Sequence, residues 1–520
     1  MGRASGVRRG PVVHSYPKWM LQINLARWMM RIRWHRSCFP HAPAECRRAG
    51  RFNAGPVNRR TFCGCTIMKT PFRTRLAAVL CALLFAGACE GDGTGATGGL
   101  NGEEARLAES VRQAAIPLTG AADEYDPLLA MLNGRRFALL GEATHGTHEF
   151  YRERAEISQR LIAEQQFAAV IVEGEWEDAW SANQYVRGTG GETSAAAALG
   201  AFNQFPLWMW RNPEVAGFLD WLRTHNAARP AAQRVGFYGM DVYGLMESLR
   251  EVPRLLEAVD PAAAEQARTR YACFGEYRSA EAYGRAVAAG ASAGCADEAR
   301  TQLAELHARW SASPGDEQLF NAMQNARVVA GGEQYFRISY RGGNAWNQRD
   351  QHMAETVTDL SRHLEARGMS GRVIAWAHNS HVGDARAAFL GGGMEQTLGR
   401  LMRERHGEQV GLVGFTTFDG SVRAAAAWGA PGQERDVRPA LAGSWESVFH
   451  GTGIPSFLLL LNQAPLAAEI GDRRLLQRAI GVSYHPETER QSHYFTAEIG
   501  SQFDAVIHID QTTALGTLAE

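Results

Sequence analysis

The sequence has no strong charge imbalance, and its N-terminal apolar run is short. It carries 54 Lys and Arg residues against 55 Asp and Glu residues, so the net charge is −1. The body of the chain contains no basic stripe, and we therefore expect no nucleic-acid partner. The apolar run at 76–85 is too short to span a bilayer.

Acidic residues are almost missing from the first part of the chain. Residues 1–67 are dense in Arg, contain only one acid, Glu45, and show no helical or strand period. They form either a basic arm or an untranslated segment before a true start at Met68. Residues 68–89 resemble a bacterial lipoprotein signal, with basic residues, the apolar run and small residues before a cysteine. The alternative is an ordinary secretory peptide.

Cysteine is scarce beyond this leader, where only Cys89, Cys273 and Cys295 remain. We predict that Cys89 is lipidated, which places the protein at the periplasmic face of the bacterial envelope with a lipid anchor in the membrane; otherwise it is secreted. The other two cysteines form an even pair in an oxidising compartment. We predict a disulfide between them rather than two buried free thiols. Residues 90–102 are rich in Gly and suit a flexible linker.

Of two common hydrolase motifs, one is missing and the other occurs only in the wrong setting. The sequence has no His-Glu-x-x-His zinc motif. Its one Gly-x-Ser-x-Gly match, at 290–294, lies in an Ala-rich helical stretch, whereas a serine nucleophile elbow follows a strand. We therefore expect no serine nucleophile and no covalent acyl-enzyme.

What the sequence does contain is a set of apolar runs that end in acids or histidines. Residues 137–140 lead into Gly141–Glu149, and later runs end at Glu173, Asp241 and His378. Each run predicts a short buried strand followed by a helix. Parallel strands would bring their carboxyl ends to one sheet edge, where open α/β folds bind ligands. The residues expected to converge there are Glu142, His145, Glu173, Asp241, His378 and His381.

This alternation predicts an α/β fold with a mostly parallel sheet flanked by helices. Residues 103–133 are expected to be helical, and further strands are expected at 410–417, 456–461 and 503–509. Residues 245–331 are Ala-rich and almost entirely helical in pattern, which predicts an inserted helical subdomain. The α/β catalytic domain then consists of 103–244 and 332–520.

Several spaced blocks resemble the erythromycin esterase family, in the right order from about residue 105 to about residue 512. They are Gly-Glu-Ala-Thr-His-Gly at 141–146, Arg154, Glu173, Gly-Met-Asp at 239–241, Asn-Gln-Arg-Asp-Gln-His-Met at 347–353 and Ala-His-Asn-Ser-His at 377–381. The resemblance implies opening of a macrolide lactone without a metal or another cofactor, and a role in antibiotic resistance. It implies a base at His145, with support from Glu142, Arg154, Glu173, His378 and His381.

The residue types themselves favour attack of water on a small-molecule ester or lactone. A histidine near neutrality can take the proton from water, and His145 is the candidate base. Glu142 can orient the imidazole, and Glu173 can do the same or hold the water. The candidates for stabilising the oxyanion are Arg154, His378 and His381.

Other residues are candidates for substrate contacts or for structural roles. Phe205, Trp208 and Trp210 lie in an aromatic stretch that forms either an apolar substrate wall or core packing around a Pro turn. Asp241 and His148 complete the predicted substrate-binding set. Asp350 is expected to be structural, and for Arg349 a structural ion pair and a functional role remain equally open.

Two alternative functions remain open. A metal-dependent hydrolase would use the same acids and histidines to hold Zn²⁺ or Mn²⁺, although their spacing matches no standard zinc signature. A lipoprotein that binds haem or another flat ligand would use paired histidines and the aromatic stretch. Six polar groups at strand ends exceed what axial haem ligation requires, which favours the enzyme.

Overall fold

The computed structural model describes residues 100–275, 277–389 and 395–518. The predicted N-terminal extension, the signal peptide with Cys89, and the linker as far as residue 99 lie outside the described residues. Within the described ranges, no helix combines the length and the apolar character needed to cross a membrane.

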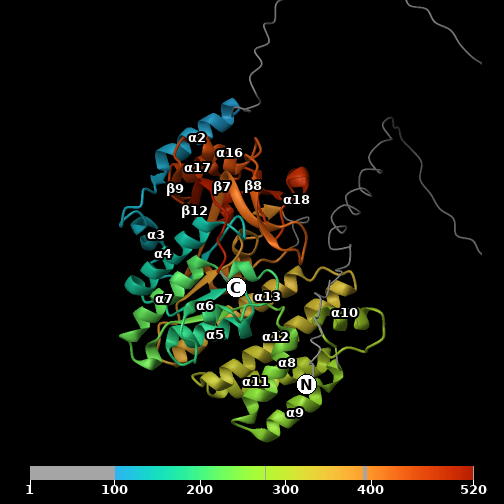
Figure 1. Ribbon diagram of the computed structural model, residues 1–520. Helices are drawn as coiled ribbons and strands as arrows, with labels where there is room; N and C mark the ends of the chain where they lie inside the picture. Colours follow the sequence, from blue (N-terminus) through green and yellow to red (C-terminus); the bar gives the residue numbers. More distant parts are fainter. Residues whose placement is uncertain (1–99, 276, 390–394, 519–520) are drawn as a thin grey trace, which may run out of the picture. The chain divides into compact units, whose positions relative to one another are not determined.

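A mixed nine-stranded sheet forms the centre of the fold (Figure 1). The strand order is β1-β9-β12-β7-β2-β5-β3-β4, and β8 pairs with β7 at the side of this path. Strands β12, β7, β2, β5, β3 and β4 run parallel to one another, whereas β1, β9 and β8 are antiparallel to their neighbours. The bounds are β1 Ile116–Pro117, β2 Phe137–Leu140, β3 Ala169–Val172, β4 Gly236–Gly239, β5 Val373–Trp376, β7 Val410–Ala425, β8 Gly432–Val437, β9 Ser456–Leu460 and β12 Ala505–Thr512.

The predicted α/β fold is confirmed, with helices on both faces of a mostly parallel sheet. Because side chains alternate along a strand, each strand contributes to two apolar cores. In β2, Phe137 and Leu139 belong to one core, and Ala138 and Leu140 belong to the other.

The α-helices outside the predicted helical insertion are α2 Gly102–Ala114, α3 Asp126–Leu132, α4 His148–Gln165, α5 Trp176–Arg187, α6 Ala195–Leu199, α7 Pro213–Ala227, α13 Trp346–Ala366, α14 Asn379–Val382, α15 Leu398–His406, α16 Trp445–His450, α17 Leu466–Ile470, α18 Glu489–Ser492 and α19 Ile499–Gln502.

The prediction of one helix over 103–133 is wrong. Helix α2 ends at Ala114, strand β1 follows, and α3 begins only at Asp126. Pro117 supplies the physical reason, because proline lacks the N–H that a helix needs and disfavours helical geometry in the residue before it. Helix α2 also begins at Gly102, inside the predicted linker, where Asn101 forms a capping box with Glu104.

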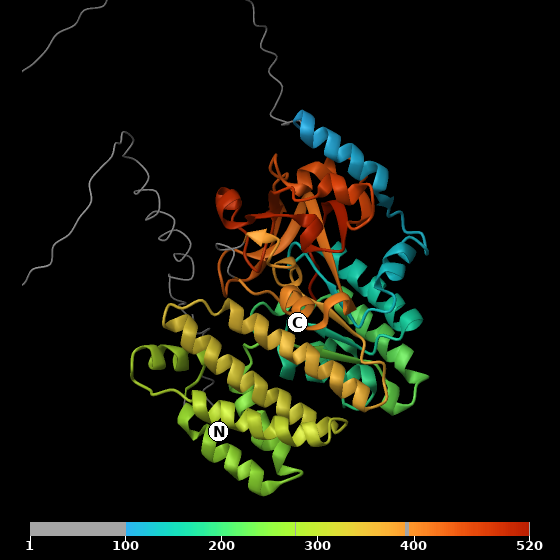
Figure 2. The same ribbon diagram turned by 180° about the vertical axis from the view of Figure 1, so that it is seen from behind.

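The predicted helical insertion consists of α8 to α12, drawn yellow-green in Figures 1 and 2, where these helices gather together. It extends beyond the predicted end at residue 331, because α12 continues without a break to Tyr340. The bounds are α8 Leu245–Glu257, α9 Pro261–Tyr271, α10 Ala280–Ala288, α11 Ala296–Ala312 and α12 Glu317–Tyr340.

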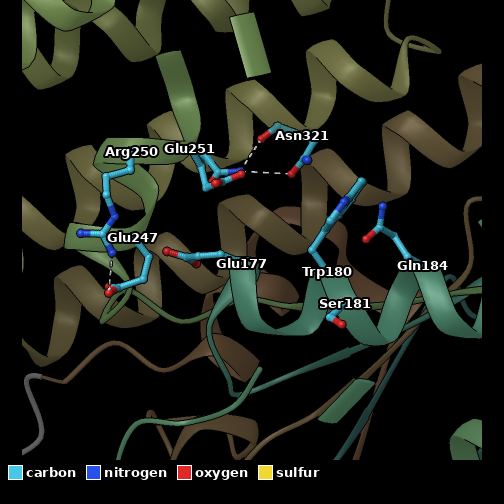
Figure 3. A pocket seen from close by; sticks show the side chains of 9 residues that line it. Glu177, Trp180, Ser181, Gln184, Glu247, Arg250, Glu251 and Asn321 are labelled. Carbon is cyan, nitrogen blue, oxygen red and sulfur yellow. Dashed lines mark hydrogen bonds and ion pairs between the residues drawn. The ribbon is translucent and has the colours of Figure 1, made fainter. Parts of the chain in front are cut away.

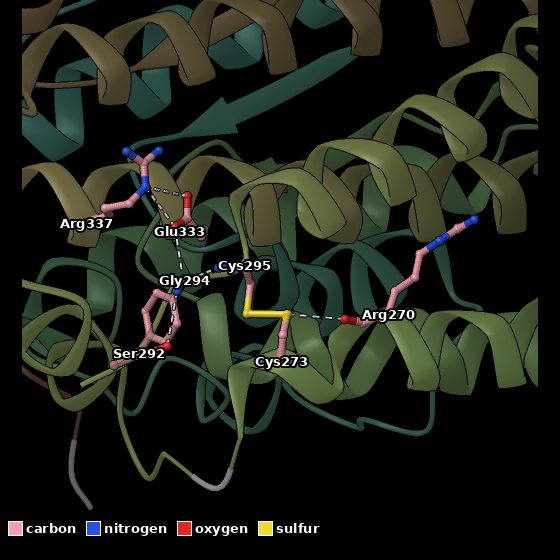
Figure 4. The surroundings of a disulfide bond; sticks show 8 residues. Arg270, Cys273, Ser292, Gly294, Cys295, Glu333 and Arg337 are labelled. Atoms are coloured by element: carbon pink, nitrogen blue, oxygen red, sulfur yellow. Dashed lines mark hydrogen bonds and ion pairs between the residues drawn. A yellow bond between two sulfur atoms is a disulfide. The ribbon is translucent and has the colours of Figure 1, made fainter. Parts of the chain in front are cut away.

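Cys273 and Cys295 lie together within this insertion (Figure 4). Their Cα atoms are 5.8 Å apart, a separation that a disulfide spans, and the structure pairs their sulfur atoms. Nearby, the backbone N–H of Cys295 donates to the hydroxyl of Tyr283, which in turn donates to Glu333 of α12. The pairing therefore links the segment after α9 to the start of α11 around α10.

A second, three-stranded sheet lies beside the end of the main one, with the order β10-β11-β6. Its strands are β6 Ala388–Phe389, β10 Leu475–Arg478 and β11 Tyr494–Ala497. The chain leaving β10 pairs at Ile480 with Thr144, in the turn that follows β2. This contact ties a segment far along the chain to the turn that carries the predicted base.

Candidate active site

The predicted acids and histidines lie at the carboxyl ends of adjacent parallel strands. Leu140 and Val172 both align with Trp376, and Val172 also aligns with Gly239. The turns that follow these residues therefore begin at the same level of the sheet. The structure brings together all the side chains expected to converge, and all are buried: Glu142, His145, Glu173, Asp241, His378 and His381.

The turn after β2 depends on close approach of backbone at two glycines. A Cβ atom at Gly141 would lie 2.1 Å from Oδ1 of Asn379, and one at Gly146 would lie 1.9 Å from the carbonyl oxygen of Arg423. Any larger residue would displace the turn. Between them, the backbone N–H of His145 donates to the carbonyl of Ile480 at 3.3 Å.

His145 and Glu142 form a buried pair within this turn. Nδ1 of His145 lies 2.8 Å from Oε1 of Glu142, while Nη2 of Arg154 donates to Oε2 of Glu142 at 2.8 Å. A carboxylate partner favours the tautomer with the proton on Nδ1, which leaves the lone pair on Nε2. Nε2 of His145 has no hydrogen-bond partner among the described residues. It is therefore free to accept a proton.

The charges around His145 shift its pKa. Burial lowers the pKa, but the hydrogen bond with Glu142 and the negative charges of Glu173 and Glu142 outweigh burial, so the pKa of His145 is raised above its usual value. The positive charge of Arg349 opposes this rise. A histidine with a raised pKa is a stronger base once it is deprotonated.

Arg349 of α13 lies at the centre of the cluster. Its Nε and Nη2 atoms donate to the two oxygens of Asp241 at 2.8 and 2.5 Å, and Nη2 also donates to Oε1 of Glu173 at 2.6 Å. Nη1 donates to Nε2 of His381 at 2.8 Å. Burial raises the pKa of Glu173, but the positive charge of Arg349 and the backbone N–H of His378, which donates to Oε2, outweigh burial and hold that pKa below its usual range. The sequence left the role of Arg349 open, and the structure makes it the link between three site residues.

Asp350, the next residue on α13, holds His381 in place. Its two oxygens accept from Nδ1 of His381 at 2.9 and 3.0 Å, and Oδ1 also accepts from the backbone N–H of Leu398. The ring of Trp346 stacks on His381 with centroids 4.3 Å apart. Asp350 has the structural role that the sequence favoured, and it exerts that role on a site residue.

The erythromycin esterase family model matches residues 162–512, more than half of the 520-residue chain. This chain belongs to the erythromycin esterase family. The resemblance inferred from the spaced blocks is thereby confirmed. The match contains Glu173, Asp241 and the histidines after β5, and it begins after the turn that carries Glu142 and His145. Membership supports hydrolase activity and implies a small-molecule substrate.

Solved structures support the same fold. A Bacillus cereus protein is 18% identical with a TM-score of 0.66, and the alignment covers 80% of this chain and 99% of that one. A succinoglycan biosynthesis protein is 17% identical with a TM-score of 0.63, covering 79% and 98%. A histidine-to-asparagine mutant of the erythromycin esterase EreC, in its open conformation, is 17% identical with a TM-score of 0.55, covering 78% and 96%.

Within this member of the erythromycin esterase family, His378 bonds the protein through both ring nitrogens, and the oxyanion role considered from the sequence stays a prediction. Its Nδ1 accepts from the backbone N–H of Ser380 at 3.2 Å and so caps α14, and its Nε2 lies 3.2 Å from the carbonyl oxygen of Ala143. Burial and the neighbouring charge of His145 lower the pKa of His378 to about 3. Both ring nitrogens therefore have protein partners, and the ring is neutral at neutral pH.

Arg154 is also buried, below the surface that a substrate could reach. Its side chain has no exposed surface, and its guanidinium lies over the rings of Tyr151 and Trp376. Of the two roles expected for it, the structure favours pairing with a carboxylate, that of Glu142. Its distance from solvent argues against direct contact with a substrate oxyanion.

The three residues of the predicted aromatic wall lie in two different environments in the structure. Trp208 and Trp210 are 4% exposed and belong to an apolar core, which corrects their assignment to the substrate wall. Phe205 is only partly buried, and its ring packs at 5.2 Å from that of Trp428, in the turn between β7 and β8. Trp428 in turn lies 6.4 Å from Tyr243, whose ring faces the Arg349 guanidinium at 5.2 Å. No sequence pattern pointed to Trp428 or Tyr243, because contacts between distant loops leave no local pattern.

His148 does not join the cluster. Its Nδ1 bonds Oε1 of Glu214, on α7, at 2.6 Å. It lies at the first position of α4, immediately after the turn, and its contact with α7 corrects the substrate-binding assignment. Among the described residues, no group of three or more His, Cys, Asp or Glu side chains is arranged to hold a metal ion.

Proposed function

We propose that this protein hydrolyses a carboxylic ester or a lactone by direct attack of water. The observation that carries the proposal is the buried Glu142–His145 pair, in which Nε2 of the imidazole has no partner within residues 100–275, 277–389 and 395–518. His145 takes a proton from water, and the hydroxide adds to the carbonyl carbon. The protonated imidazole then gives its proton to the departing alkoxide, so His145 returns to its starting state.

The oxyanion of the tetrahedral intermediate needs a positive charge or a hydrogen-bond donor nearby. With His378, Arg154 and His381 bonded to other groups of the protein, Arg349 is the residue of the cluster that suits this role. Arg349 cannot lose its proton under ordinary conditions, so its charge is constant. We therefore assign the electrostatic stabilisation to Arg349, and we assign to His381 the positioning of its guanidinium, because Nε2 of His381 accepts from Nη1 of Arg349.

The substrate we propose is a macrolide-type lactone or another ester with an apolar body. This rests on the family name and on the aromatic side chains that extend outward from Arg349: Tyr243, Trp428 and Phe205. Opening a lactone adds one water and gives a single hydroxy acid, whereas an acyclic ester gives two products. Such an activity would inactivate a macrolide antibiotic.

The test is hydrolysis of erythromycin and a panel of simple esters and lactones, followed by mass spectrometry. We expect products that carry one added water, and no acylated protein in the intact-protein spectrum. An acyl-protein adduct would contradict direct hydrolysis. A protein that purifies with a visible haem band and hydrolyses nothing on the panel would favour the ligand-binding alternative.

We further propose that the protein acts at the periplasmic face of the envelope, anchored through Cys89. The support is the sequence pattern of residues 68–89 alone. Labelled palmitate should be incorporated into the wild-type chain and not into Cys89→Ser. Incorporation into both chains, or into neither, would contradict the anchor.

A further inference from the structure

A cavity lined by none of the site residues lies between α5, α8 and α12 (Figure 3). Its volume is about 330 Å³, within the range of small-molecule sites. Figure 3 shows Glu177 and Trp180 projecting from α5 toward residues of α8 and α12. The hydrolytic mechanism uses none of these side chains.

The lining carries more negative than positive charge. Glu177, Glu247 and Glu251 face the cavity, and Arg250 is its one basic residue. Arg250 is 68% exposed and donates to Glu247 of its own helix at 3.1 Å. It therefore leaves the carboxyl of Glu177 without a counter-charge.

Glu177 is the residue that points to a ligand. Its Oε1 accepts from the hydroxyl of Ser248 at 2.7 Å, but its Oε2 is buried and has no hydrogen-bond partner among the described residues. A buried carboxyl oxygen without a partner is costly. Burial, together with the charges of Asp178 and Glu247, raises the pKa of Glu177 to about 8. A bound cation would supply both the missing donor and the missing charge.

Trp180 indicates which kind of cation fits. Its indole lines the same cavity and is held by packing against Trp176, with centroids 5.9 Å apart. An aromatic face attracts organic ammonium groups through its quadrupole. The described residues offer no set of three ligands for a metal ion here. The carboxyl and the ring together suit an ammonium group on a carbon chain.

We propose that this cavity binds an organic ammonium ion, with Glu177 as its anionic partner and Trp180 as the ring that covers its chain. Glu247 and Glu251, on the α8 side, form ion pairs with the exposed Arg250 and Arg254 of their own helix. A second ammonium group can replace these weak surface partners, so a diamine or polyamine fits better than a monoamine. The site lies outside the hydrolytic cluster and does not depend on the proposed ester substrate.

The test is isothermal titration of the full chain with spermidine, putrescine and butylamine. We expect one spermidine per chain, with weaker binding of the monoamine. Glu177→Gln should weaken spermidine binding by at least about tenfold, because a charge-assisted hydrogen bond is lost. Glu192→Gln, the same change in an exposed loop after α5, is the matched control and should bind as the wild type does.

A second measurement detects the proton that Glu177 releases when the amine binds. At pH 7, below the pKa of about 8, Glu177 carries a proton, and an ammonium ion favours the ionised form. Binding should therefore release a proton, so the measured heat should vary with the ionisation enthalpy of the buffer. This variation should vanish at pH 7 in Glu177→Gln, which has no proton to release. The charged groups that face Glu177 are Glu175, the residue before α5, Asp178 of α5, and Glu247, Arg250 and Glu251 of α8.

Several outcomes would overturn the proposal. They are no amine binding by the wild type, equal binding by Glu177→Gln, or an equal response to Mg²⁺, which would indicate a nonspecific charge effect. If Glu177→Gln does not fold, Trp180→Leu replaces it, and unchanged spermidine affinity in that variant would equally contradict the site.

Discussion

Nδ1 of His145 lies 2.8 Å from Oε1 of Glu142, and the opposite oxygen of that carboxylate is held by the fully buried Arg154. The imidazole is thus fixed by a carboxylate that cannot itself turn away. This arrangement orients one ring nitrogen toward the interior of the turn and frees the other. The proposed mechanism depends on that second nitrogen.

Removing the base should remove most of the activity. In His145→Asn the side chain can no longer accept a proton from water, so kcat should fall by roughly 10²- to 10⁴-fold. His148→Asn is the matched control, because its imidazole bonds Glu214 outside the cluster, and its kcat should stay close to that of the wild type. Equal losses in the two variants would contradict the assignment of the base.

The pH profile should report the pKa of His145. The base must be neutral, so kcat/KM should rise with pH through a pKa above the usual value of a histidine, since the pKa is raised in the folded protein. In Glu142→Gln the hydrogen bond and charge that raise the pKa are lost while burial remains. The rising limb should then move to lower pH, with a lower plateau. A limb that stays in place would show that another group titrates.

Arg349 should matter for stability as well as for turnover. Arg349→Met leaves the buried carboxylates of Glu173 and Asp241 without their partner, which should cost about 3–5 kcal/mol of unfolding free energy. Adding Asp241→Asn removes one of the stranded charges and should recover part of that loss. Denaturant unfolding of the single and double variants measures both effects, and additive losses would contradict the pairing.

Asp350 should act through His381 as a positioning residue. Asp350→Asn removes the charge that holds the proton on Nδ1 of His381, so the ring tautomer should change and kcat should fall while KM changes little. The imidazole nitrogen shifts in NMR report the tautomer directly. Unchanged nitrogen shifts together with a lower kcat would indicate that Asp350 acts in another way.

The disulfide should contribute to stability in the oxidised protein. A bridge with a sequence separation of 22 residues is expected to stabilise the fold by about 3 kcal/mol through the unfolded chain. Cys273→Ser with Cys295→Ser should lower the unfolding free energy by that amount, and reduction of the wild type should do the same. Two free thiols in the unreduced, denatured wild type, beyond any from the six cysteines of residues 1–89, would contradict the prediction.

The parts of the fold that follow from local sequence were predictable. The buried strands β2, β3, β4 and β5 are short apolar runs bounded by polar turns, and their direction follows once a helix separates each from the next. The convergence of acids and histidines at one sheet edge follows from that direction. The prediction of a helix over 103–133 was wrong because it gave too little weight to Pro117, which interrupts the helical segment.

The contacts between distant segments were not predictable. The central position of Arg349 depends on how α13 docks beside three strand ends. For its neighbour Asp350 the sequence predicted only a structural ion pair, and it did not indicate that His381 is the partner. The burial of Trp208 and the exposure of Trp428 depend on how two loops pack. No period or motif in a single sequence encodes such docking.

Activation of water by His145 can be tested by mass spectrometry of the EDTA-treated full chain and of His145→Asn, each incubated with erythromycin and with simple esters and lactones. We predict that the wild type adds one water to at least one substrate, that EDTA has no effect, and that the variant is inactive. Equal turnover by the variant, or activity that returns only with added metal, would contradict hydrolysis by a water that His145 activates.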